Sequence, residues 1–258
     1  MEGNVKNLLK KIHPKQSLKE LRWFDILILT AIIWGNSILT STQMWIASLS
    51  ATEVVDASVS SFSSSDDWWA IGNEVKLLVI ALIYLFIRHF DFKQLKVKLH
   101  WNVLLWAPAI FLGAGFLCDL AFDVFDLFPS LTDNFTYLGY FPYYDWSISS
   151  VIEKFATLSP SRVLFSLMNG FYEEFYFLGL LLSTNKTYRP WILIFSTIVR
   201  ISFHTYQGLQ SALVIGVVFG LFYYFMYTRK NDNLLPFFLG HAFADMVGTS
   251  FFYLFVAG

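Results

Sequence analysis

The sequence predicts an all-α, polytopic membrane protein with about seven transmembrane helices. Three observations support this prediction: an apolar composition, a series of long apolar stretches, and an alternation of charge between the loops that join them. Of the 258 residues, 56% are hydrophobic and only 14% are charged, whereas an average soluble domain carries roughly 25% charged residues. This composition excludes a disordered chain and argues against a soluble enzyme. The net charge of −1 gives no basic footprint for nucleic acid, and a single cysteine, Cys118, excludes an intrachain disulfide.

Seven stretches approach the roughly 20 mostly apolar residues that a helix needs to cross a bilayer. We expect transmembrane helices over residues 23–49, 75–90, 101–125, 163–182, 191–206, 209–227 and 234–256. The Ser-rich run at residues 48–67 predicts a solvated loop between the first two helices. We divide the chain into a basic segment at residues 1–22, N-terminal transmembrane helices with their loops at residues 23–160, and a core at residues 161–258.

The basic residues indicate how the chain is oriented. When the seven helices alternate in direction, 14 of the 18 Lys and Arg residues fall on one side. They are Lys6, Lys10, Lys11, Lys15, Lys19, Arg22, Arg88, Lys93, Lys96, Lys98, Lys186, Arg189, Arg229 and Lys230. By the positive-inside rule this side is the cytoplasm. We therefore expect a multi-pass protein of the cell membrane, bacterial in origin, with a cytoplasmic N-terminus and extracytoplasmic loops on the other side that carry the acidic residues.

Ionisable residues concentrate in the late apolar stretches, although a charge inside a bilayer is costly unless it is paired or faces a polar cavity. The fourth stretch contains Glu173 and Glu174, the fifth contains Arg200 and His204, and the seventh contains His241 and Asp245. At about 1.5 Å of rise per residue, these side chains lie at compatible depths in the membrane. We expect them to form one polar cluster. The alternative is that they are structural polar contacts between helices.

Helix geometry limits how these side chains can act. Adjacent residues point about 100° apart, so Glu173 and Glu174 cannot both face one reacting atom. His241 and Asp245 are four residues apart and share a helix face. A carboxylate with two histidines can bind zinc and activate water, or it can activate water without a metal, with Glu as the general base. The sequence leaves both chemistries open.

The motifs in these helices resemble those of the CPBP family, the CaaX-protease and bacteriocin-processing intramembrane endopeptidases, also called the Abi family. The family pattern is Glu-Glu-x-x-x-Arg, Phe-x-x-x-His and His-x-x-x-Asn/Asp on separate transmembrane helices, and residues 163–248 match its order and spacing. The resemblance implies that the last four helices form a catalytic core, in which Glu173 activates water and Glu174 supports it. It also implies that His204 and His241 hold this water or, with Glu173, a zinc ion, and that Asp245 helps to stabilise the oxyanion.

Two positions depart from the family pattern. Leu178 occupies the arginine position of the first motif, and Arg200 occupies the phenylalanine position of the second. Two buried carboxylates need a counter-charge. We hypothesise that Arg200 supports the site by supplying the cation that position 178 lacks.

The leading functional prediction is an intramembrane endopeptidase that uses Glu-activated water. Its partners would be the lipid bilayer and a membrane-associated peptide or protein, cleaved at a bacteriocin or signal-peptide leader or at a CaaX-like tail. The departures leave open a CPBP-like protein without proteolysis, which acts in bacteriocin self-immunity or as a scaffold. A transporter with a proton relay is a third reading, but no repeat symmetry supports it.

Overall fold

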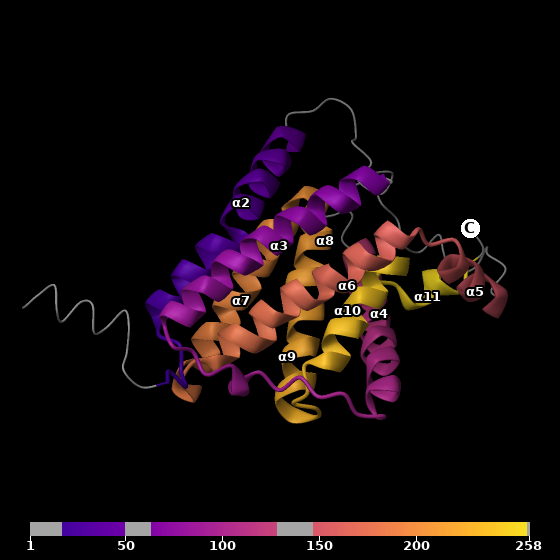
Figure 1. Ribbon diagram of the computed structural model, residues 1–258. Helices are drawn as coiled ribbons and strands as arrows, with labels where there is room; N and C mark the ends of the chain where they lie inside the picture. Colours follow the sequence, from indigo (N-terminus) through magenta and orange to yellow (C-terminus); the bar gives the residue numbers. More distant parts are fainter. Residues whose placement is uncertain (1–16, 50–62, 128–146, 257–258) are drawn as a thin grey trace, which may run out of the picture.

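The computed structural model describes residues 17–49, 63–127 and 147–256, and in these residues the regular elements are helices (Figure 1). The α-helices are α2 (Trp23–Leu49), α3 (Ser64–Ile87), α4 (Val103–Asp126), α5 (Ile148–Ala156), α6 (Pro160–Glu174), α7 (Arg189–His204), α8 (Leu209–Leu213), α9 (Gly220–Arg229), α10 (Leu235–Val247) and α11 (Phe251–Leu254). The π-helical segment η5 (Phe175–Leu180) continues α6, and a second one, η9 (Val214–Phe219), joins α8 to α9.

The fold class is confirmed: the protein is an all-α, multi-pass membrane protein. Within the described residues, four helices are long and apolar enough to cross a membrane: Trp23–Leu49, Ser64–Ile87, Val103–Phe125 and Leu209–Arg229. The other three predicted spans coincide with α6 and its π-helical continuation, α7 and α10. Their α-helical runs are shorter, and they carry the ionisable residues of the late stretches. Most of the predicted basic segment, residues 1–16, lies outside the described residues.

Two predicted boundaries are wrong. The second transmembrane helix begins at Ser64 and not at residue 75, because Ser63 and Asp66 form a capping box that starts the helix earlier. Glu74 therefore lies within a helix and not in a loop. The helix of the last predicted span, α10, ends at Val247, where Gly248 adopts a φ of +92° that terminates it. The short helix α11 then forms a separate element, so the span does not continue to residue 256.

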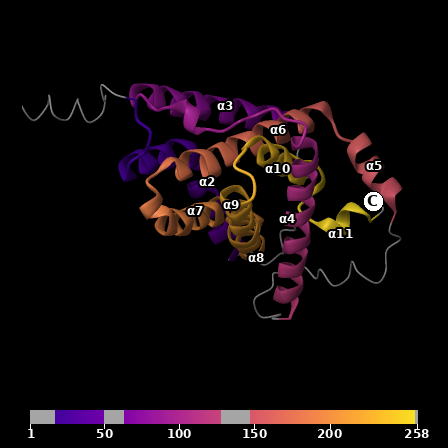
Figure 2. The same ribbon diagram turned by 90° about the horizontal axis from the view of Figure 1, so that it is seen from below.

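Helix α10 lies between α6 and α4, as both ribbon views show (Figures 1 and 2). Gly170 permits the close approach of α6 to α10. A Cβ atom at this position would lie 2.5 Å from the backbone oxygen of Phe238 and 2.8 Å from the backbone nitrogen of Ala242, inside van der Waals distance. This contact brings the glutamates of α6 within reach of the α10 side chains.

Helix α3 packs along α6, and both helices run in the same direction (Figure 1). Their N-terminal ends are joined by a hydrogen bond between the hydroxyls of Ser64 and Ser161 at 2.7 Å. The ion pair between Arg162 and Asp67, at 3.3 Å, adds a second connection one turn further on. These contacts set the register between the two helices.

An aromatic cluster joins α2 to the helices that carry the ionisable residues. The indole of Trp34 stacks on Phe203 of α7, with ring centroids 4.1 Å apart, and on Phe177 of η5 at 5.6 Å. The hydroxyl of Tyr172 donates a 2.8 Å hydrogen bond to the backbone oxygen of Ile33. Buried aromatic pairs contribute about 0.5–1.5 kcal/mol each beyond their burial, so this cluster stabilises the position of α6 relative to α7.

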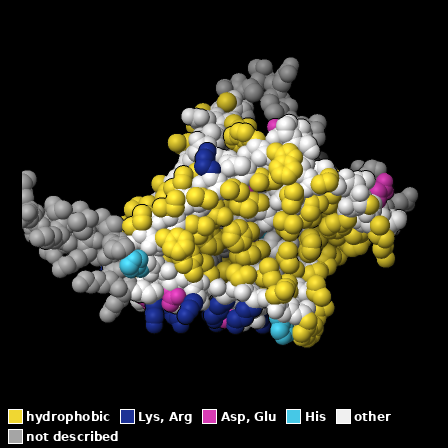
Figure 3. Space-filling view, viewed as in Figure 1, with side chains coloured by type: hydrophobic (Ala, Val, Ile, Leu, Met, Phe, Trp, Pro, Cys, Tyr) yellow, Lys and Arg dark blue, Asp and Glu magenta, His cyan; other side chains and the backbone are white. Residues whose placement is uncertain are grey.

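The surface matches a protein embedded in lipid. A broad hydrophobic face covers one side of the molecule, and Lys and Arg side chains gather along one edge of it (Figure 3). Exposed apolar residues on this protein include Val79, Ile83 and Phe86 of α3. Below this face, a fully buried ion pair between Arg88 and Asp25, 2.5 Å long, connects α3 to α2. An apolar surface of this extent is typical of a membrane or partner contact.

Candidate active site

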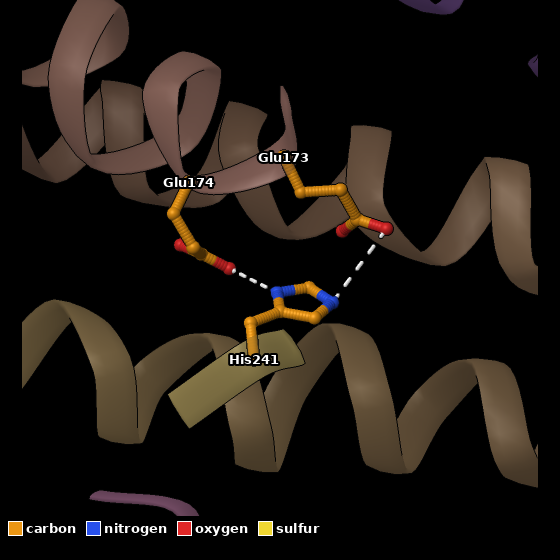
Figure 4. Close-up of side chains that lie close together, drawn as sticks. All are labelled: Glu173, Glu174 and His241. Atoms are coloured by element: carbon orange, nitrogen blue, oxygen red, sulfur yellow. Dashed lines mark hydrogen bonds and ion pairs between the residues drawn. The ribbon is translucent and has the colours of Figure 1, made fainter. Parts of the chain in front are cut away.

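Glu173 and Glu174, the last two residues of α6, approach His241 of α10 (Figure 4). The Nδ1 atom of His241 lies 2.8 Å from Glu174 Oε1, which is a hydrogen bond, and its Nε2 atom lies 3.8 Å from Glu173 Oε1. All three side chains are buried. Because a carboxylate only accepts, Nδ1 carries the proton that is donated to Glu174, and Nε2 faces Glu173. Glu174 therefore orients the imidazole toward Glu173.

Helix α6 changes its winding directly after the two glutamates. The π-helical segment η5 begins at Phe175. Such segments are rare and occur frequently at functional sites. The second one, η9, contributes Phe219, whose ring meets His241 edge-on at 5.2 Å.

Arg200 of α7 contacts both glutamates. Its Nη1 lies 3.3 Å from Glu173 Oε2, and its Nη2 lies 3.1 Å from Glu174 Oε1. The guanidinium carbon lies 3.9 Å from the ring centroid of Phe177 and 5.6 Å from that of Phe219. Arg200 itself is 1% exposed. This geometry is the one that the counter-charge hypothesis requires: the arginine comes from the second motif and reaches both carboxylates of the first.

Asp245 and Asn169 complete the polar cluster on the side of α6 that faces α10. The Nδ2 atom of Asn169 donates to Asp245 Oδ2 at 2.8 Å and to Glu173 Oε1 at 3.3 Å. Asp245 Oδ1 lies 3.7 Å from His241 Nε2, and the Asp245 side chain is 21% exposed. The two oxygens of Glu173 thus have different surroundings: Oε2 meets Arg200, whereas Oε1 meets Asn169 and faces His241.

His204, the remaining predicted site residue, ends α7 next to this cluster. Its Nδ1 atom lies 2.8 Å from the backbone oxygen of Arg200, one helical turn earlier. Because a carbonyl oxygen only accepts, Nδ1 carries the proton and Nε2 is the free acceptor of the neutral ring. The imidazole also packs against Phe203, at 4.1 Å between ring centroids. His204 is buried and is joined to the cluster through Arg200.

A metal site was predicted from Glu173, His204 and His241. Among the described residues, Glu173, Glu174 and His241 each bring one ligand atom within 4.8 Å of the others, and His204 is not a member of this group. Arg200 places its positive charge on both carboxylates, and His241 Nδ1 already bonds to Glu174. A zinc ion would have to displace these contacts and lie beside a guanidinium. As arranged, this set of residues does not fit zinc.

Sequence reasoning missed two polar residues near the site. Asn169 is four residues before Glu173, a spacing that puts both on one helix face. Glu74 was assigned to a loop, but it lies on α3, and its carboxylate interacts electrostatically with Glu173, Asp245 and His241. The capping box at Ser63 was the sequence signal that could have placed Glu74 in a helix.

Comparison with known families agrees with this geometry. The model of the type II CAAX prenyl endopeptidase Rce1-like family matches residues 156–247. The matched segment is about a third of the chain, and it is similar to this part of the CPBP family. The match runs from the end of α5 through α10 and covers Glu173, Glu174, Arg200, His204, His241 and Asp245. No curated protein and no solved structure matched the chain significantly. At the level of the family, the matched segment is similar to that of a CAAX-type intramembrane protease.

Proposed function

We propose that this protein is an intramembrane endopeptidase in which Glu173 is the general base. The observation that carries the proposal is the orientation of His241 by Glu174, which aims Nε2 at Glu173 Oε1. The 3.8 Å between these two atoms is longer than a direct hydrogen bond. We propose that the attacking water binds to Glu173 Oε1 beside the imidazole. Such a water donates one proton to Glu173 and presents a lone pair to the substrate.

Hydrolysis then proceeds by addition and elimination. The water oxygen attacks the scissile carbonyl carbon while Glu173 Oε1 takes one water proton. The C–N bond breaks as the tetrahedral intermediate collapses, and Glu173 returns its proton to the leaving nitrogen. The products are a carboxylic acid and an amine, so the reaction consumes one water and regenerates the site.

The other polar residues position Glu173. Arg200 holds Oε2, and Asn169, supported by Asp245, donates to Oε1. His204 helps to position Arg200, because its Nδ1–H donates a hydrogen bond to the backbone oxygen of Arg200. We propose that the reaction is metal-independent, because Arg200 supplies the positive charge next to the two glutamates that a metal ion would otherwise supply.

The substrate is a peptide or protein held at the membrane. The family similarity favours a CAAX-like tail, and an apolar leader peptide of a bacteriocin or signalling peptide presents the same kind of amide. We propose that the protein lies in the cell membrane of a bacterium with its N-terminus in the cytoplasm. The loop after α3 contains Lys93, Lys96 and Lys98. Basic side chains gather along one edge of the molecule (Figure 3), and this supports the orientation.

The decisive experiment uses the purified full chain in proteoliposomes. Two peptide panels are incubated with it: farnesylated peptides that end in Cys-x-x-x, and unprenylated peptides with apolar leaders. Mass spectrometry identifies products. Glu173→Gln keeps the shape of the side chain but removes the base, so it should reduce cleavage by roughly 10²–10⁴-fold while the protein still accumulates in the membrane. Equal cleavage by both proteins, or cleavage by neither, contradicts the proposal. In the second case a non-proteolytic scaffold is the better description.

A further inference from the structure

Glu74 lies beside the proposed active site although it is outside the family segment. Helices α3 and α6 run side by side from a common starting level, where Ser64 bonds to Ser161. Ten residues along α3 lead to Glu74, and the same number of residues along α6 leads to the turn that precedes Glu173. At 1.5 Å per residue, both carboxylates therefore lie at about the same level. This placement agrees with the electrostatic interaction between Glu74 and the residues Glu173, Asp245 and His241.

The Glu74 carboxylate is incompletely satisfied. Its Oε2 atom is buried and has no hydrogen-bond partner among the described residues. The hydroxyl of Tyr172, a near neighbour, is already used on the backbone oxygen of Ile33. The residue as a whole is partly buried. A buried carboxylate oxygen without a partner costs free energy unless a ligand satisfies it.

The nearby cations are paired with other carboxylates. Arg200 contacts Glu173 and Glu174, and Arg162 pairs with Asp67. Glu74 therefore brings a carboxyl group with an unpartnered oxygen to the edge of the site, beside Asp245. A cationic group that enters there gains charge-assisted hydrogen bonds, which are about twice as strong as neutral ones.

We propose that Glu74 is a specificity-determining residue that binds a Lys or Arg side chain of the substrate close to the scissile bond. The inference rests on the proposed endopeptidase function and goes beyond it, since it names the residue type that the enzyme prefers. Glu74 acts on binding of the substrate, and it exchanges no proton with the reacting water.

The test measures kcat/KM for matched peptides, drawn from whichever panel is cleaved, with Lys, norleucine or Glu at each position flanking the scissile bond. We expect the wild-type protein to prefer Lys over norleucine at one position by about tenfold or more, as for a hydrogen bond to a charged group. Glu74→Gln should abolish this preference, measured as the ratio of kcat/KM for the Lys and norleucine peptides within the same variant. Glu74→Lys should shift the preference to Glu. Lys76→Gln, a charge change at an exposed position of the same helix, is the control and should behave as wild type.

Two results overturn the inference. One is a wild-type protein that cleaves Lys and norleucine peptides equally, a measurement that needs no variant. The other is a Lys preference that Glu74→Gln retains. Failure of the proposed function looks different, because then neither the wild type nor any variant cleaves any peptide above the Glu173→Gln background, and the specificity inference falls with it.

Discussion

Replacing Arg200 with Leu should destabilise the protein and disable the site together. Arg200 is 1% exposed and contacts both Glu173 and Glu174, at 3.3 and 3.1 Å. Leu removes the charge but leaves two buried carboxylates, for which His241 is then the nearest partner. Removing one partner of a buried ion pair costs about 3–5 kcal/mol. The contact of the guanidinium with the Phe177 ring, at 3.9 Å, adds up to about 2 kcal/mol that is also lost.

The assay combines thermal unfolding in detergent with peptide cleavage in proteoliposomes. Arg200→Leu should unfold at a lower temperature, and its cleavage rate per folded molecule should fall by roughly 100-fold or more, since a displacement of about 1 Å can cost that much. Arg200→Lys should be intermediate, because an ammonium keeps the charge but cannot form the planar, two-pronged contact.

The matched control is Arg88→Leu. Arg88 is the other fully buried arginine of the described residues, and it pairs with Asp25 far along the chain from the site helices. Its loss should also lower the unfolding temperature, but folded molecules should cleave at the wild-type rate. If Arg200→Leu matched the wild type in both stability and cleavage, the counter-charge role of Arg200 would be refuted. If both variants lost activity per folded molecule equally, the effect would be one of general stability.

Two further predictions concern the packing of the site helices and the metal. Gly170→Ala should reduce cleavage strongly, because the new Cβ meets the α10 backbone at 2.5 Å and must push His241 away from the glutamates. Gly72→Ala, where a Cβ would meet nothing within 4 Å, is the control. Equal activity of both variants would show that the close helix contact is not needed. A chelator such as 1,10-phenanthroline should leave cleavage unchanged, and stoichiometric zinc in the purified protein with loss of activity on its removal would contradict the metal-independent mechanism.

The order of the polar motifs was readable from the sequence because helix geometry is local. The spacing of His241 and Asp245 places both on one face, and the structure brings both next to Glu173. The adjacent pair Glu173 and Glu174 was expected to divide its roles. In the structure, Glu174 bonds to His241 Nδ1 whereas Glu173 faces Nε2.

Other features depended on contacts between distant segments. The Ser-rich composition before residue 67 suggested a loop, but the capping box at Ser63 starts a helix that carries Glu74 to the site. Length and hydropathy identified the long apolar helices. The α-helical runs of α6, α7 and α10 have only 15, 16 and 13 residues, fewer than the roughly 20 that cross a bilayer.

By itself, the amino-acid sequence determined that this chain enters a membrane as a bundle of helices and that its late helices carry a shared polar chemistry. Apolar length and charge alternation are properties of each segment and need no partner to be read. Only the tertiary structure decided which polar atoms meet: Arg200 on both glutamates, Asn169 between Glu173 and Asp245, and Glu74 at the edge of the site. These contacts depend on the register between helices. The close packing of α6 against α10 at Gly170 and the hydrogen bond between α3 and α6 set this register, and no single segment encodes it.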